Sequence, residues 1–272
     1  KMKIVILMED TCGNPSCAYE HGLSVYVETD RHRLLVDTGA SGAFMQNAKE
    51  LGIDLTAVDT VILSHGHYDH AGGIMDFHAC NPDAEIYMQR TACGAYYHKD
   101  RYIGIDRSIA AYDSVRMLDG GKRIDDELFL FGNITGRKYF AKSNLELSKQ
   151  VDGKQMQDQF EHEQCLVITQ GGEHTLISGC AHNGILNVLS RYREYYEKPP
   201  KMVISGFHMM KKGAYEPEEQ QIICETARQL CTKELADTVF YTGHCTGSPA
   251  FALMKPYLGE RLIQIHSGMQ IC

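Results

Sequence analysis

Four side chains of types that commonly bind metal ions stand within six residues of this sequence: His65, His67, Asp69 and His70. They follow the β-branched segment 60–63, which predicts a turn at the end of a short strand. Neutral imidazole and carboxylate are good ligands for divalent transition metals. His65 and His67 can face one point on extended backbone. Asp69 and His70 are adjacent and point apart on regular backbone, so the spacing allows them to serve two different ions.

Three more histidines follow segments that read as strands, namely His182, His208 and His244. Each could reach a metal site at the same rim of the molecule, because a turn after a strand can direct a side chain away from the sheet. Cys180 precedes His182 by two residues. It can bind metal as a thiolate or pack as a small apolar residue, and both interpretations stay open at this point.

The elements that must position these residues alternate between strands and helices. The first half predicts strands at 3–8, 23–28, 33–36, 60–63 and 85–88, with a helix around 44–51. After strands at 115–117 and 127–131, the second half predicts a hairpin at 164–169 and 173–178, helices from Ile185, Pro217 and Ser248, and strands at 202–205, 238–242 and 262–265. This order indicates two packed sheets with helices outside.

No linker divides the chain, so we expect a single domain over residues 1–272. The polar segment 138–159 has little periodicity and is long for a connection, so we expect a lid or insertion within about residues 90–160.

The segment from Ser64 to His70 resembles the His-x-His-x-Asp-His signature of the metallo-β-lactamase superfamily, and Val36-Asp37-Thr38-Gly39 resembles its first Asp motif. The resemblance implies an α/β fold of the αββα sandwich type, with two mixed sheets and helices on the outer faces. It also implies that His65 and His67 bind one metal ion, that Asp69 and His70 bind the other, and that Asp37 supports these ligands.

Downstream, the resemblance implies that His182 is a ligand and that His244 is the last metal-binding histidine. Cys180 stands where the superfamily usually has a metal-bridging Asp, which is a departure from the pattern. The usual third histidine motif falls near residues 160–163, where His162, Asp158 and Glu163 compete for the role, and the choice stays open. The pieces 20–24, 178–184, 206–209 and 244–247 look like the branch that contains archaeal dihydropterin ribofuranosylaminobenzene phosphate synthase-like proteins.

These features together predict a hydrolase with two divalent metal ions, zinc first, with manganese or iron as alternatives. Asp69 would orient the metal-bound water, and His208 would donate a proton to the leaving group. The expected substrate is a small molecule, with phosphate esters and phosphodiesters as the leading class. The alternatives are synthase-type phosphoribosyl chemistry in pterin metabolism and a metal-binding or redox protein without hydrolysis. Against the di-iron redox alternative, His67 stands where those relatives have a Glu.

The composition excludes several other classes. The net charge of −8 predicts no non-specific binding to nucleic acid or anionic membranes. No apolar stretch approaches the ~20 residues that a membrane span needs. None of the ten cysteines form a Cys-x-x-Cys pair, which argues against a zinc knuckle. Free thiols in a chain without an export signal predict a cytoplasmic protein.

Overall fold

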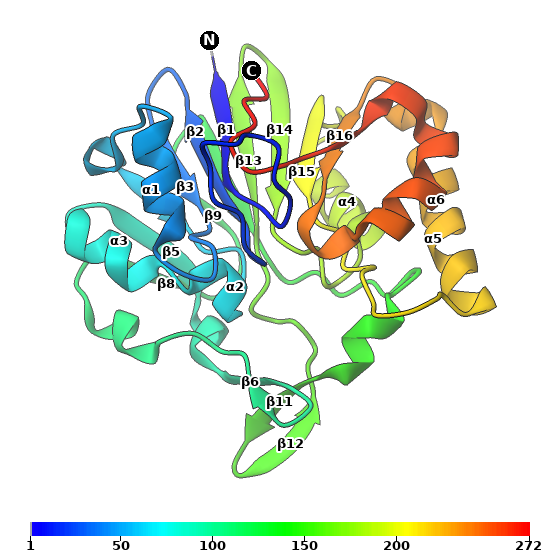
Figure 1. Cartoon of the computed structure of the whole chain (residues 1–272), viewed down its shortest axis with the longest axis horizontal. Coiled ribbons are helices and arrows are strands. Elements are labelled where there is room, and N and C mark those ends of the chain that lie inside the picture. The colour runs from blue at the N-terminus through cyan, green and yellow to red at the C-terminus, as the bar shows by residue number, and fades with distance from the viewer. Residues whose placement is uncertain (1) are drawn as a thin grey trace.

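The computed structural model describes residues 2–272 and places two large mixed sheets face to face (Figure 1). The first sheet has the order β1-β2-β3-β4-β5-β8, in which β1 to β3 are antiparallel neighbours and β3, β4, β5 and β8 run parallel. Its strands are β1 (Lys3–Met8), β2 (Ser24–Glu28), β3 (Arg33–Val36), β4 (Thr60–Ile62), β5 (Glu85–Gln89) and β8 (Val115–Leu118).

The second sheet has the order β17-β16-β15-β14-β13-β10-β9. Strands β14 to β17 are parallel, whereas β9, β10, β13 and β14 pair antiparallel. Its strands are β9 (Lys122–Arg123), β10 (Leu128–Phe131), β13 (Cys165–Gln170), β14 (Glu173–Ser178), β15 (Met202–Ser205), β16 (Val239–Thr242) and β17 (Leu262–Gln264).

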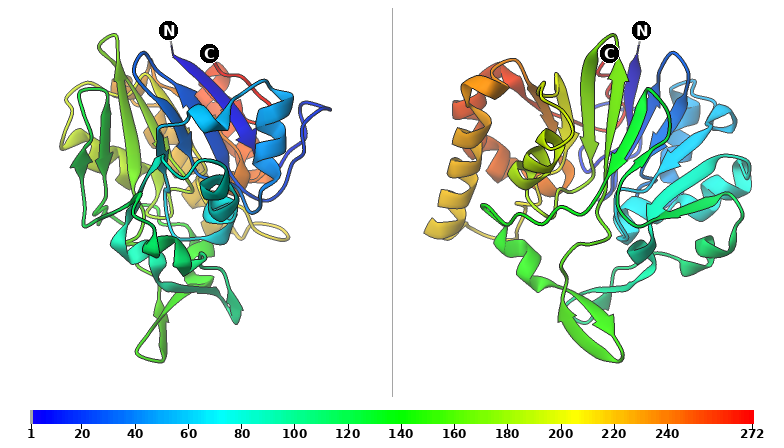
Figure 2. Two further views of the ribbon diagram at one scale, coloured as in Figure 1. Left: turned by 90° about the vertical axis from the view of Figure 1, so that its left-hand side faces the viewer. Right: turned by 180° about the vertical axis from the view of Figure 1, so that it is seen from behind.

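Helices cover the outer face of each sheet, so the expected αββα sandwich is confirmed (Figures 1 and 2). The first sheet carries α1 (Ala43–Glu50) and α3 (Ile74–Cys80), and the short α2 (Tyr68–Ala71) lies near its lower edge in Figure 1. The second sheet carries α4 (Ile185–Arg193), α5 (Pro217–Leu230) and α6 (Ser248–Leu258). In the part of the chain that the structure describes, no helix is long and apolar enough to cross a membrane.

The alternation of side chains along β1 explains how one strand serves two apolar layers. Ile4 and Ile6 pack between the two sheets, whereas Val5 and Leu7 pack against the helices outside the first sheet. Because successive side chains in a strand point to opposite faces, a continuous apolar run predicts a strand buried on both faces. Each buried aliphatic side chain contributes about 1.5–3 kcal/mol of transfer free energy. These layers give the strand ends a rigid base.

The polar segment 138–159, which lies within the expected lid or insertion, has secondary structure of its own. It contains η4 (Lys142–Glu146), β11 (Leu147–Val151) and β12 (Lys154–Gln157). These strands join β6 (Ala95–His98) and β7 (Arg101–Tyr102) in a small sheet of order β12-β11-β6-β7, which projects below the sandwich (Figure 2). The polar sequence of this segment shows no strand pattern, because β12 is an edge strand exposed along its whole length and therefore lacks an apolar face.

Candidate metal centre

The candidate residues lie where parallel strands of the two sheets end. Asp37 follows β3, and His65 follows β4, its parallel neighbour. In the second sheet Cys180, His208 and His244 follow the parallel strands β14, β15 and β16. Because parallel strands end at the same edge of a sheet, side chains far apart in sequence meet there.

The backbone turns sharply at several of these strand ends. Asp37, Ala181, His208 and His244 have φ angles of 61°, 48°, 49° and 47°. Non-glycine residues rarely adopt this left-handed region, and such strain is concentrated at functional sites. The turns carry the side chains out of the strand direction and toward one another.

The first cluster, which we name group A, consists of His65, His67 and His182. Nitrogen atoms of the three rings lie within 4.8 Å of one another, and all three residues are buried. The Nε2 atoms of His65 and His182 are 3.2 Å apart. The structure thus brings His182 to the pair that the sequence spacing had suggested.

The second cluster, group B, consists of Asp69, His70, Cys180 and His244, all buried. His70 Nε2 lies 3.0 Å from both Cys180 Sγ and His244 Nε2. Asp69 Oδ2 lies 3.6 Å from His70 Nε2 and 3.3 Å from His244 Nε2. The suggestion from their spacing that Asp69 and His70 serve two different ions is wrong, because both belong to this cluster. They lie on the short α2, where adjacent side chains point about 100° apart rather than to opposite sides.

Each of four histidines has its Nδ1 atom held by a polar partner, which leaves Nε2 directed into the clusters. A metal-binding histidine usually has its second nitrogen fixed in this way, which sets the tautomer and the ring orientation. The Nδ1 partners are Ser64 Oγ for His65 (2.8 Å), Asp37 Oδ2 for His70 (2.6 Å), Asn144 Oδ1 for His182 (3.0 Å) and Asp10 Oδ1 for His244 (2.6 Å).

The Nε2 atom of His67 is buried and has no hydrogen-bond partner. A buried polar atom without a partner costs about 1–3 kcal/mol, and native structures rarely contain one without a reason. A metal ion held by the three Nε2 atoms of group A would satisfy it. The unsatisfied His67 nitrogen, together with the neighbouring imidazole nitrogens of group A, therefore fits a metal ion.

Comparisons with known proteins agree with this geometry. A family model described as the metallo-beta-lactamase superfamily matches residues 19–134. The crystal structure of Tm1679, described as a metal-dependent hydrolase of the beta-lactamase superfamily, is 29% identical, with a TM-score of 0.83 over 100% of this chain and 99% of that chain. The chain has the metallo-β-lactamase fold and is similar to members of that superfamily. Its buried His and Asp side chains are arranged as candidate metal ligands.

Two similar proteins come from Methanocaldococcus jannaschii. An uncharacterized protein, MJ0448, is 28% identical over 76% of this chain and 79% of its own length. The 7,8-dihydropterin-6-methyl-4-(beta-D-ribofuranosyl)-aminobenzene-5'-phosphate synthase is 25% identical over 98% of this chain and 95% of its own length. YhfI from Bacillus subtilis, described as a metallo-beta-lactamase fold protein, shares the fold of this chain, with 14% identity and a TM-score of 0.56.

The three residues left open at the usual third histidine position support the loops that carry the candidate ligands. His162 is fully buried and does not face solvent. Its Nδ1 accepts a hydrogen bond from the Gly66 N–H (2.8 Å), and its Nε2 lies 3.0 Å from Asp158 Oδ2. Glu163 accepts hydrogen bonds from the backbone N–H groups of His182 and Asn183. Because both nitrogens of His162 already have partners, His182 takes the third place in group A.

His208 lies beside group A but outside both clusters. Its ring centroid is 4.1 Å from that of His182. Ser143 Oγ donates a hydrogen bond to the His208 carbonyl oxygen (2.7 Å) and lies 3.0 Å from His208 Nδ1, which assigns the ring hydrogen to Nδ1. Burial lowers the pKa of His208 to about 3, so the ring is neutral near neutral pH. Its catalytic role stays a prediction.

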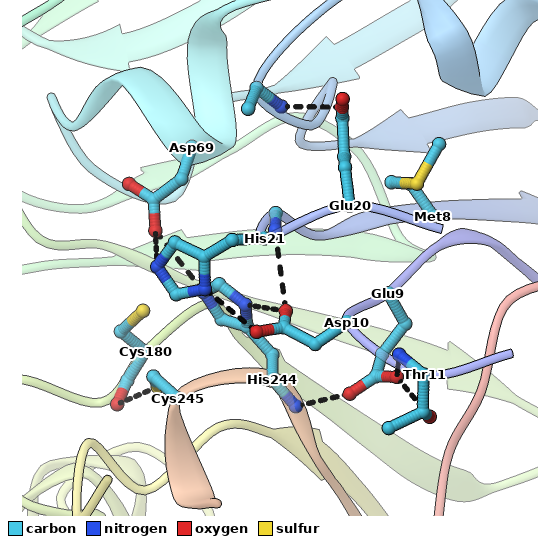
Figure 3. A network of polar contacts seen from close by, with 12 residues as sticks. Met8, Glu9, Asp10, Thr11, Glu20, His21, Asp69, Cys180, His244 and Cys245 are labelled. Atoms are coloured by element: carbon cyan, nitrogen blue, oxygen red, sulfur yellow. Dashed lines mark hydrogen bonds and ion pairs between the residues drawn. The ribbon is translucent and has the colours of Figure 1, made fainter. Parts of the chain in front are cut away.

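Asp10 and Glu9, which no motif in the sequence identifies, follow β1 and form hydrogen bonds with His244 on the side away from the ligand clusters. Asp10 accepts hydrogen bonds from Nδ1 of His244 and from Nδ1 of His21 (Figure 3). Glu9 accepts a hydrogen bond from the backbone N–H of His244. Two acidic residues directly after an apolar strand were the available signal, since a carboxylate at a strand end can reach the same rim as the other candidates.

Four groups of the centre have charges that suit cation binding, whereas Asp10 and Asp69 raise the pKa of His244 against the opposing effect of burial, and burial raises that of the Cys180 thiol. Burial opposes ionisation of Asp69 and Asp10, but nearby histidines outweigh it and hold the pKa of each carboxyl well below its usual range. Burial lowers the pKa of His65 and His182, as do the neighbouring histidines. Anionic carboxylates and neutral imidazoles are the forms that bind metal.

Proposed function

We propose that this protein is a metal-dependent hydrolase whose two metal ions activate a water molecule for attack on a phosphate ester, a phosphodiester or a similar small substrate. The observation that carries the proposal is the pair of adjacent ligand groups, A and B. Their rings meet directly, since the centroids of His65 and His70 are 4.2 Å apart. Two ions held by these adjacent groups would be close enough to act on one water and one substrate.

Group A would hold one ion with three histidines and leave a position open. Group B would hold the other with Asp69, His70, His244 and the Cys180 thiolate. When bound, two such ions lower the pKa of water and polarise a substrate oxygen. Zinc is the leading candidate because it accepts imidazole, carboxylate and thiolate ligands together, with manganese or iron as alternatives.

The residues of the chain fix the reacting geometry. Asp37 accepts hydrogen bonds from the Ser64 backbone N–H and hydroxyl and lies 2.6 Å from His70 Nδ1. Ser64 also contacts His65, so one carboxylate and one hydroxyl link groups A and B. We propose that Asp69 orients the attacking water and that His208 passes a proton to the leaving group. The His208 ring hydrogen is on Nδ1, beside Ser143. The proton for the leaving group would therefore come from Nδ1, or Nε2 would first have to take up a proton.

A direct test measures hydrolysis of bis-p-nitrophenyl phosphate and p-nitrophenyl phosphate by protein loaded with zinc, manganese or iron. We expect metal-dependent turnover of at least one of these esters, abolished by chelator and restored by metal. Full metal loading without turnover of either ester or of a related small ester would contradict the hydrolase proposal.

A second candidate is synthase chemistry of the kind named for the full-length M. jannaschii relative. The near-complete coverage of both chains favours it, although the identity is only 25%. The test asks whether the metal-loaded protein forms the aminobenzene phosphate compound named for that synthase, detected by mass spectrometry. Product formation without ester hydrolysis would favour this candidate over the hydrolase.

A further inference from the structure

Two thiol groups lie side by side at the edge of group B. Cys180 follows β14 and belongs to group B, whereas Cys245 follows His244 after β16 and belongs to neither group. Both residues are buried and unpaired in the structure. Cys245 Sγ lies 3.7 Å from the Cys180 carbonyl oxygen (Figure 3). The Cys245 side chain also interacts with the Cys180 thiol and, together with burial, raises its pKa.

This contact reaches across an intervening strand. In the sheet β15 separates β14 from β16, and Gly206 follows β15. Its N–H donates to the Gly179 carbonyl oxygen (2.8 Å). A side chain at Gly206 would overlap the Cys245 sulfur, and its Cβ atom would lie 3.6 Å from the Cys180 Cα atom. The glycine therefore leaves the space through which the Cys245 sulfur approaches Cys180.

The Cys245 sulfur is also held in place. It accepts a hydrogen bond from the His208 N–H (3.3 Å), and the Cys245 carbonyl oxygen accepts one from the Met210 N–H (2.8 Å). A thiol fixed beside a second thiol favours an intramolecular disulfide over other oxidation products.

We propose that peroxide oxidises Cys180 and Cys245 to a disulfide, and that this bond removes Cys180 from the group B metal site. One thiol is oxidised to a sulfenic acid as the peroxide O–O bond breaks and releases water. The second thiol attacks that sulfur, the S–S bond forms, and a second water leaves. Overall, two thiols and one hydrogen peroxide give one disulfide and two waters. The effect on metal binding rests on the proposed role of Cys180 as a ligand.

The position of the Cys180 sulfur in the reduced protein explains why the disulfide should affect the group B metal site. Cys180 Sγ lies 3.0 Å from His70 Nε2, as a shared ligand set requires. A covalent bond to Cys245 would direct this sulfur away from His70 and remove its thiolate. Group B would then keep only Asp69, His70 and His244, and a thiol reductant would restore the fourth ligand.

The test treats metal-free and zinc-loaded full-length protein with hydrogen peroxide, alkylates the remaining thiols and maps the peptides by mass spectrometry. We expect a peptide pair linked through Cys180 and Cys245, lighter by two hydrogen atoms, in the metal-free protein. Zinc should protect against it. Zinc titration of the oxidised protein should show weaker binding at one of the two sites, with recovery after reduction.

Two variants serve as controls. Cys245→Ala should not form the link, whereas Cys165→Ala, which removes a buried thiol in β13, should still form it. Gly206→Ala keeps both thiols but displaces the Cys245 sulfur, so it should form little link. Recovery of both cysteines alkylated or separately oxidised would overturn the proposal. A complete link with unchanged zinc binding would overturn the effect on the metal site. Peptide mapping needs no substrate, so its outcome is separate from the test of hydrolysis.

Discussion

The carboxylate of Asp10 lies 2.6 Å from Nδ1 of His244 and thereby fixes the ring that joins group B from β16. The same carboxylate holds Nδ1 of His21 at 2.7 Å. This arrangement keeps the His244 Nε2 atom directed at Asp69 and His70. Removal of a carboxylate that orients a metal-binding histidine lowers metal affinity by about 10- to 100-fold.

Asp10→Asn should therefore weaken one of two zinc sites by about 10- to 100-fold and leave the other unchanged. Zinc titration of metal-free protein with an indicator measures both affinities. Asp106→Asn is the matched control, because the Asp106 carboxylate is exposed and only caps a turn at Ser108. Equal affinities for Asp10→Asn and wild type would show that Asp10 does not act through His244.

His67→Ala removes one of the three candidate ligands of group A, whose buried Nε2 atom has no hydrogen-bond partner and lies 3.9 Å from Asp158 Oδ2. We expect the variant to keep its fold, because the apolar layers lie away from this loop, but to bind one metal ion fewer. Activity should fall by at least about 10²-fold. Circular dichroism and metal counting check the two expectations. Near-normal turnover in this variant would mean that the reaction occurs elsewhere.

His208→Ala should keep both metal ions and lose turnover by about 10²–10⁴-fold, because His208 lies beside group A without belonging to it. The deficit should be smallest for substrates with good leaving groups, which need no proton. Rates across a series of aryl phosphodiesters, with the metal content of each preparation, test this. Loss of one ion in the variant would instead identify His208 as a ligand.

A pH-dependent contribution to stability lies away from the metal centre. His32 bonds to Asp125 through Nε2 (2.8 Å) and to Asp59 through Nδ1 (2.9 Å). Burial opposes protonation, but these carboxylates outweigh it and raise the pKa of His32 above its usual value. The stabilisation is therefore complete below the unfolded pKa of about 6.5 and is lost as pH rises through the raised folded pKa.

His32→Gln should destabilise the protein by about 1 kcal/mol or less at about pH 5.5 and by less than that above about pH 9. Urea unfolding at both pH values measures the difference. His98→Gln is a suitable control, because His98 pairs with one exposed carboxylate, that of Glu146. A larger effect at high pH than at low pH would contradict the assigned charge of His32.

The sequence was informative where function depends on closely spaced residues. His65, His67, Asp69 and His70 fall within six positions, so their types and spacing alone indicate a metal site. The apolar strand β1 was equally clear, because it is buried on both faces.

The sequence was not informative where the local backbone conformation, or a contact between distant residues, determines where a side chain lies. Asp69 and His70 converge because α2 replaces extended backbone. Asp10 and Asn144 reach their histidines across 234 and 38 residues of sequence, and no local pattern reports such contacts. The polar strands β11 and β12 form a sheet through backbone pairing, which side-chain polarity does not reveal.

The most direct test of the two-metal account is anomalous diffraction at the zinc edge from crystals of the zinc-loaded protein. We expect two peaks, one among the Nε2 atoms of His65, His67 and His182, and one among Asp69, His70, His244 and Cys180. A single peak at saturating zinc, or strong peaks only at other residues, would contradict it.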